Sequence, residues 1–283
     1  MNQPAISKAT IALIILILGA AMLSWIPSVD QAATQQIDTG LHRAMLSFGL
    51  AKGFNLLISL FQSSQISIAF ATLTIGEVLD PLNDLVEQFS NLMLLATVAF
   101  GIQKVLISIG GHFVIKSVVT IIALSACALL LMKRQLPTWL TNALILALMV
   151  RLAIPVASIA SGEIYTAFLE PQYTASAISL GKSAEQLESL KSSLQKGTLS
   201  VQATESASSE SSGIFGFKKV LSTLNPSEKM QQLSQLVTSI GEQMTTDIIN
   251  QIVVFLLQTM IFPIGLIWVL FKIGVSLMYR SRP

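Results

Sequence analysis

Charged side chains are scarce in this chain. Asp, Glu, Lys and Arg make up 11% of its 283 residues, whereas soluble domains average about 25%. The shortage is concentrated in long uncharged blocks, which separates a membrane protein from a soluble protein with a large core. The net charge is only +2, and no basic run exceeds two adjacent residues, so we expect no nucleic acid among the partners.

Cysteine and histidine are nearly absent as well. The single cysteine, Cys127, excludes an intrachain disulfide and a Cys-based metal site, and the two histidines lie far apart in the sequence. The chain has no HExxH, no GxSxG, no phosphate-binding loop and no dinucleotide-binding glycine pattern. The sequence therefore predicts no catalytic residue, no metal and no cofactor, and we expect a protein that is not an enzyme.

Long hydrophobic runs are what the chain does have. Residues 9–29 and 248–271 contain no charge, and about 20 apolar residues in a helix cross a hydrocarbon core of about 30 Å. Further uncharged runs lie between these two. The pattern predicts an all-α fold: a polytopic helical membrane protein with about six transmembrane helices and an extramembrane helical hairpin.

The N-terminal half is expected to begin with a signal-anchor transmembrane helix over 1–27. A cleaved signal peptide is the alternative, but the apolar stretch is longer than the usual 7–15 residues of such signals. Apolar residues then recur at three- and four-residue spacing over 28–52, which predicts an extramembrane amphipathic segment.

A transmembrane helical bundle is expected over 53–160. Its first part, 53–76, is uncharged but rich in Ser, Gln and Thr, so it fits a transmembrane helix, a helix lying flat at the interface or a short strand. We favour the transmembrane helix. Asp80-Pro81 predicts the start of the next helix, and the link Gly110-Gly111-His112 predicts an antiparallel helix pair around it.

Residues 161–247 differ in composition from the apolar runs, because six lysines and nine acidic residues lie between positions 163 and 247. Leu180, Leu187 and Leu194 repeat every seven residues, which indicates an amphipathic helix. A Ser-rich linker over 198–213 and a second helix from Asn225 complete the expected extramembrane hairpin. The last part, 248–283, is expected to be a C-terminal transmembrane helix and basic tail.

Basic residues flanking the spans predict the orientation. With six spans, Lys8, Lys133-Arg134 and Arg280/Arg282 all fall on the cytoplasmic side, as cytoplasmic flanks are rich in Lys and Arg. Residues 161–247 are then extracytoplasmic, and both termini are cytoplasmic. Five spans fit this rule less well. The compact loops indicate a bacterial inner membrane.

Three basic residues in or beside the apolar runs are the sharpest candidates for function. Arg151 lies inside a span, where a charge costs about 2.5–3.5 kcal/mol on insertion scales. In the six-span arrangement Lys104, Lys116 and Arg151 all lie toward the outer half of the membrane, where they could contact a pore or bind an anion or a lipid phosphate. The alternative is a structural arginine that snorkels or binds backbone carbonyls.

A polar helix stripe of Asn55, Ser59, Gln62 and Ser63 could face a bundle interior. The stripe and Arg151 favour a homo-oligomeric, channel-like or conduit assembly in the lipid bilayer. The alternative is a membrane scaffold or accessory subunit that binds a protein partner through residues 175–245. A secondary transporter ranks third, because no internal repeat is evident.

Overall fold

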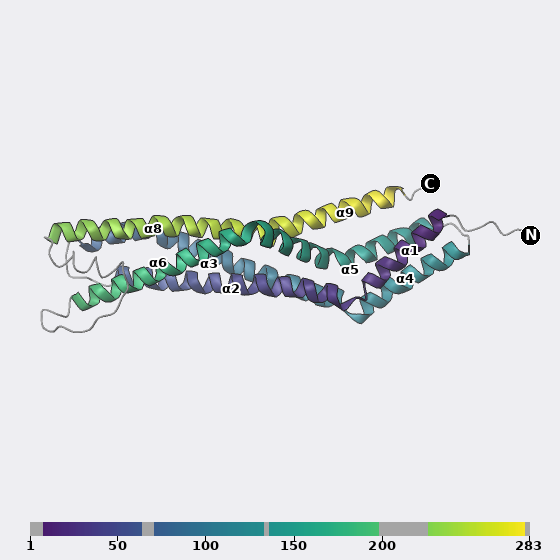
Figure 1. The fold of residues 1–283 in the computed structure, drawn as a ribbon, viewed down its shortest axis with the longest axis horizontal. Helices are drawn as coiled ribbons and strands as arrows, with labels where there is room; N and C mark the ends of the chain where they lie inside the picture. Colours follow the sequence, from purple (N-terminus) through teal and green to yellow (C-terminus); the bar gives the residue numbers. More distant parts are fainter. Residues whose placement is uncertain (1–7, 64–70, 133–135, 198–225, 281–283) are drawn as a thin grey trace, which may run out of the picture. The chain divides into compact units, whose positions relative to one another are not determined.

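The computed structural model describes residues 8–63, 71–132, 136–197 and 226–280. Of these residues 96% are helical and none is in a strand (Figure 1), which confirms the all-α prediction. Four helices are long and apolar enough to cross a membrane, or five if one bent pair counts as a span. The chain is therefore a helical protein with several membrane-spanning candidates, and the predicted count of six is not confirmed.

Eight α-helices and two π-helical turns make up the described part of the chain. They are α1 (Lys8–Leu23), α2 (Pro27–Ser63), α3 (Ala71–Gly110), α4 (Phe113–Leu131), α5 (Thr138–Ile164), η1 (Tyr165–Leu169), α6 (Glu170–Gly197), α8 (Pro226–Leu256), η2 (Leu257–Ile261) and α9 (Phe262–Arg280).

The expected transmembrane helix over 53–76 is described only in part. Residues 53–63 belong to α2 and 71–76 to α3, while 64–70 lie outside the described residues, so this prediction is not tested. Asp80-Pro81 does not start a helix either, because Pro81 lies inside α3. The expected Ser-rich linker over 198–213 also falls outside the described part of the chain.

The helices contribute to two compact units. The first unit comprises Met1–Met45, Leu95–Glu170 and Val254–Pro283, and the second comprises Leu46–Leu94 and Pro171–Val253. α2, α3 and the long helices that contain α5 and α9 each contribute to both units. The two units bury different kinds of surface, so each is described by itself.

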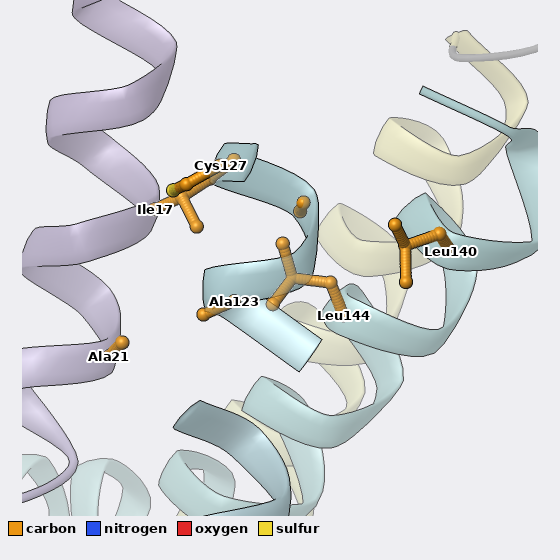
Figure 2. Packing of buried hydrophobic residues seen from close by; sticks show 7 residues of the cluster. Ile17, Ala21, Ala123, Cys127, Leu140 and Leu144 are labelled. Atoms are coloured by element: carbon orange, nitrogen blue, oxygen red, sulfur yellow. The ribbon is translucent and has the colours of Figure 1, made fainter. Parts of the chain in front are cut away.

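Apolar helices form one part of the first unit. α1 packs on α4, α4 on α5, and α5 on α9, and small residues on α1 and α4 allow a close approach of the helices. Figure 2 shows the cluster that they bury: Ile17, Ala21, Ala123, Ala126, Cys127, Leu140 and Leu144. Most of their outward side chains are also apolar, among them Ile15, Leu16, Ile121, Leu124, Trp268 and Phe271. Helices that are hydrophobic all round are typical of lipid contact.

The start of α2 and the end of α3 form the other part of this unit. Gly40 of α2 faces the ring of Phe100 on α3, and a Cβ placed at Gly40 would lie 2.5 Å from that ring. Gly162 of α5 likewise faces the side chain of Gln36. Glycine at these two positions allows the helices to approach closely.

Both π-helical turns end two residues before a proline. η1 ends at Leu169 and Pro171 follows, while η2 ends at Ile261 and Pro263 follows. Proline has no N–H and its ring clashes with the carbonyl four residues earlier. The wider π turn accommodates the ring, so both helices continue past their prolines.

The second unit is an amphipathic helical bundle. It buries apolar residues from α2, α3, α6 and α8: Phe54, Ile58, Leu79, Val86, Phe89, Leu180, Leu187, Val237, Ile240 and Met244. Leu180 and Leu187 are the predicted heptad positions of α6, and both are buried. Charged residues such as Lys182, Glu185 and Glu188 are exposed on that helix. Such a polar surface suits water.

We expect Gly40→Ala to lower the thermal stability of the detergent-solubilised protein. The added methyl would push the buried ring of Phe100, and overpacking costs about 1–3 kcal/mol. Gly49→Ala on the same helix is the matched control, because a Cβ there meets nothing within 4 Å and alanine favours a helix by about 0.8–1.0 kcal/mol. Thermal unfolding followed by circular dichroism measures both. Equal stabilisation by the two variants would contradict the close approach at Gly40.

Candidate functional site

Two helix breaks lie side by side in the first unit, and we call them the joint. At the first break α1 ends and the chain turns through residues 24–26 into α2, with a bend of 51° between the helices. At the second, Gly111 and His112 link α3 to α4. Trp25 connects the two breaks, because its indole N–H donates to Thr120 Oγ1 of α4 at 2.7 Å and its ring meets that of Phe113 edge-on at 5.9 Å.

Asp30 binds two cations at the joint. Its Oδ2 lies 2.7 Å from Arg151 Nη2 and 3.0 Å from Lys116 Nζ, so one carboxylate oxygen joins the first turn of α2 to α4 and α5. Arg151 Nη2 also donates to the Ser24 carbonyl at 3.0 Å, in the turn after α1. The turn, α2, α4 and α5 are therefore held by a single polar cluster.

Burial makes this cluster energetically important. The Arg151 side chain is 0% exposed, Lys116 is 14% exposed and Asp30 is 19% exposed. A buried charge is tolerated when it is paired and hydrogen-bonded, and Asp30 supplies the pairing. The three side chains together carry a formal charge of +1.

Several polar atoms of the cluster are buried without a hydrogen-bond partner in the described structure. They are Arg151 Nε and Nη1, Asp30 Oδ1 and Ser24 Oγ. Buried groups of this kind usually bind ordered water. The cluster holds donors and acceptors in about equal number, so it suits water molecules as bridging partners better than a reacting substrate.

Lys104 is placed differently from the other two predicted cations. Its Nζ lies 2.6 Å from Asp38 Oδ1, and these side chains are 48% and 46% exposed. Exposed ion pairs contribute about 0–1 kcal/mol. The structure thus brings Arg151 and Lys116 together on Asp30, while Lys104 pairs separately with a carboxylate two turns further along α2.

The predicted polar stripe belongs to the second unit. Asn55 is half-buried and Ser59 is exposed, both on α2. The side chains of Gln62 and Ser63 lie outside the described part of the structure. A more continuous polar face appears earlier on α2, where a shallow hollow is lined by Asp30, Gln31, Thr34, Gln35, Asp38, Thr39 and His42.

A small polar cavity of about 10 Å³ lies elsewhere in the first unit. Its lining includes Gln36, Gln103, Ser158 and Gln258, and the Gln258 side-chain oxygen is buried without a partner in the described residues. Ser161 donates to the Gln258 carbonyl at 3.2 Å. The volume holds about one water molecule, so this cavity is too small for an organic ligand.

Asp30 is the residue of this cluster that sequence reasoning missed. The predicted site contained three cations and no carboxylate, yet each cation pairs with a carboxylate: Lys104 with Asp38, and Arg151 and Lys116 with Asp30. A signal was present: Asp30 is the first acidic residue after the uncharged run 9–29, and a buried cation needs a nearby anion. No group of three or more His, Cys, Asp or Glu that could hold a metal occurs in the described ranges.

We expect Asp30→Asn to destabilise the protein by about 3 kcal/mol or more, because it leaves Arg151 buried without a counter-charge. Asp38→Asn is the matched control, since its pair with Lys104 is exposed and its loss costs less than about 1 kcal/mol. The double variant Asp30→Leu/Arg151→Met should recover part of the loss. Thermal melts in detergent measure these effects. Equal losses of stability for Asp30→Asn and Asp38→Asn would contradict a stabilising buried ion pair between Asp30 and Arg151.

Comparison with protein families, curated proteins and solved structures found no family model, protein or structure that matches this chain. The geometry above is therefore the basis for a functional proposal.

Proposed function

We propose that this chain is a non-enzymatic integral membrane protein that acts as a scaffold. The first unit anchors it in the bilayer, and the second unit presents a helical surface to a protein partner. Helix length carries this proposal. Two candidate spans run for 55 residues (Thr138–Ser192) and 43 residues (Ser234–Ser276), whereas about 20 residues cross a bilayer. More than half of each helix is thus left to build an extramembrane bundle.

The placement of Arg151 supports a scaffold over a conduit. A pore-lining arginine needs contact with water or with the passing ion. Arg151 is instead fully buried and bound to Asp30 and the Ser24 carbonyl. Its role in this proposal is to fix the angle at which α2 leaves α1, which favours a rigid support.

The apolar helices of the first unit are the proposed membrane layer. α1, α4, the first half of α5 and α9 pack on one another in that order, and most of their outward side chains are apolar, although Lys272 of α9 is exposed. α3 is also apolar enough to span. We place it outside the layer because its neighbour in the unit, the start of α2, carries Asp30, Asp38 and His42, which are costly in lipid.

Four crossings place Lys8, Lys133-Arg134 and Arg280/Arg282 on the same side of the membrane. By the positive-inside rule this side is cytoplasmic, and the second unit is then extracytoplasmic. Both termini are cytoplasmic in this arrangement, which fits a bacterial inner membrane.

Cysteine labelling tests the topology. In a Cys127→Ala background, we expect Asp84→Cys, exposed on α3, to react with a membrane-impermeant maleimide added to intact spheroplasts. Six crossings would place position 84 in the cytoplasm and protect it. A reporter fused at Pro283 should be active only in the cytoplasm, and one inserted at Ser209 only outside; the opposite pattern would refute the four-span arrangement.

Site-directed photo-crosslinking tests the scaffold. A photoreactive residue at Gln186, exposed on α6, should give one discrete protein adduct in living cells. The same residue at Ile121, 66% exposed on the apolar surface of α4, is the control and should react with lipid alone. The charge reversals Glu185→Lys and Glu188→Lys should abolish the adduct at Gln186. No protein adduct at any exposed α6 position would argue against a scaffold.

A homo-oligomeric conduit is the second candidate. The observation that favours it is the polar hollow along the start of α2, which could line a water-filled passage if several copies turned these faces inward. In proteoliposomes, a methanethiosulfonate cation attached at Gln35→Cys would then reduce ion flux, while the same label at Ile121→Cys would not. Absence of flux from the unlabelled protein would remove this candidate.

A further inference from the structure

α3 exposes a regular row of apolar side chains near its end, and we call it the α3 seam. Its members are Leu95 (53% exposed), Val98 (49%), Ile102 (56%), Val105 (58%) and Ile109 (56%). They follow one another at spacings of three, four, three and four residues. The opposite side of α3 provides the contacts within the unit, because Ala96, Phe100 and Ile107 are at most 4% exposed.

The spacing of the seam matches that of a coiled coil. An alternating three-four pattern averages 3.5 residues, which is the period of the a and d positions that pack knobs into holes against a second helix. All five seam residues are leucine, isoleucine or valine, the residue types usual at these positions. The flanking positions include Ala99, Gly101 and Ser108, whose small side chains let a second helix approach.

Lipid does not suit this part of the unit. Lys104, on another side of the same helix segment, forms an exposed ion pair with Asp38, and the exposed side chains at the start of α2 include Gln31, Gln35 and His42. In a bilayer these polar groups would have to be shielded from lipid. In water the apolar seam would have to be buried against another protein surface. Since the polar groups can be hydrated, the seam is the surface that needs a protein partner.

The area is sufficient for self-association. Five apolar side chains about half exposed, with Leu106 beside them, present roughly 500 Å² per copy, which reaches the size of patches that mark interaction sites. Two such faces would bury at most about 1,000 Å², which is about the area that a biological interface must reach. A different protein would need a helix with an apolar row of the same spacing and length. A second copy of this chain already has such a row.

We propose that the α3 seam is the contact surface for a second copy of this chain, so that the protein is a dimer joined along residues 95–109. This inference deepens the proposed scaffold, since a dimer presents two copies of the second unit. It does not depend on the identity of the partner bound there. The contact is isologous, because each seam packs on the same five residues of the other copy.

Disulfide cross-linking in native membranes tests the contact. In the Cys127→Ala background, Ile102→Cys should form a covalent dimer on oxidation, because position 102 is the centre of the seam and meets itself in either helix orientation. Leu95→Cys should dimerise in a parallel pair. In an antiparallel pair, Leu95→Cys should instead cross-link to co-expressed Ile109→Cys. Gln35→Cys on α2 and Ile121→Cys on α4 are exposed controls and should remain monomeric.

The reverse experiment removes the seam. Ile102→Gln/Val105→Gln should lower the mass of the detergent-solubilised particle from twice 30.5 kDa to 30.5 kDa by light scattering, without lowering the melting temperature of the monomer. Ile121→Gln should leave the dimer intact.

A wild-type monomer in membranes, with no cross-link at position 102, would overturn the proposal, as would a cross-link at Gln35 in its place. The latter result would support the conduit. Failure of the dimer would leave a photo-adduct at Gln186 unaffected, so the two proposals are tested separately.

Discussion

The arrangement of the first unit depends on the carboxylate of Asp30. Arg151 and Lys116 come from two different helices, and each would be costly to bury alone. By binding both, Asp30 fixes the start of α2 against α4 and α5. The same guanidinium holds the Ser24 carbonyl, so the end of α1 is tied to the cluster as well. Without this carboxylate the two helix breaks have few other polar contacts to hold them, chiefly the Trp25–Thr120 hydrogen bond.

The two units differ in the side chains that they expose. The apolar helices of the first unit have hydrophobic residues on both their buried and outward sides, whereas helices of the second unit bury one apolar stripe and expose charge. Between these extremes lies the start of α2, which is polar outward and packs on α3 through Gly40. This intermediate zone contains the joint, the polar hollow and the α3 seam. In this part of the molecule the start of α2 exposes polar side chains and the end of α3 exposes apolar ones.

Sequence periodicity predicted the all-α class, the apolar character of α4 and the buried heptad positions Leu180 and Leu187, because these depend on local spacing. It did not predict the continuation of α3 through Pro81. This continuation depends on packing against other helices, which overrides local signals. The pairing of Arg151 with Asp30 joins positions 121 residues apart. One sequence cannot reveal such a contact unless burial of the charge is already known.

The π-helical turns before Pro171 and Pro263 have a geometric consequence. A π turn inserts one extra residue into the winding of a helix, and one residue corresponds to about 100° of rotation at 3.6 residues per turn. The sides of the helix that face inward before and after the turn are therefore offset. The division between the units falls next to both turns, at Glu170–Pro171 and Val253–Val254. Each long helix can thus bury a different side before and after its π turn while its backbone remains unbroken.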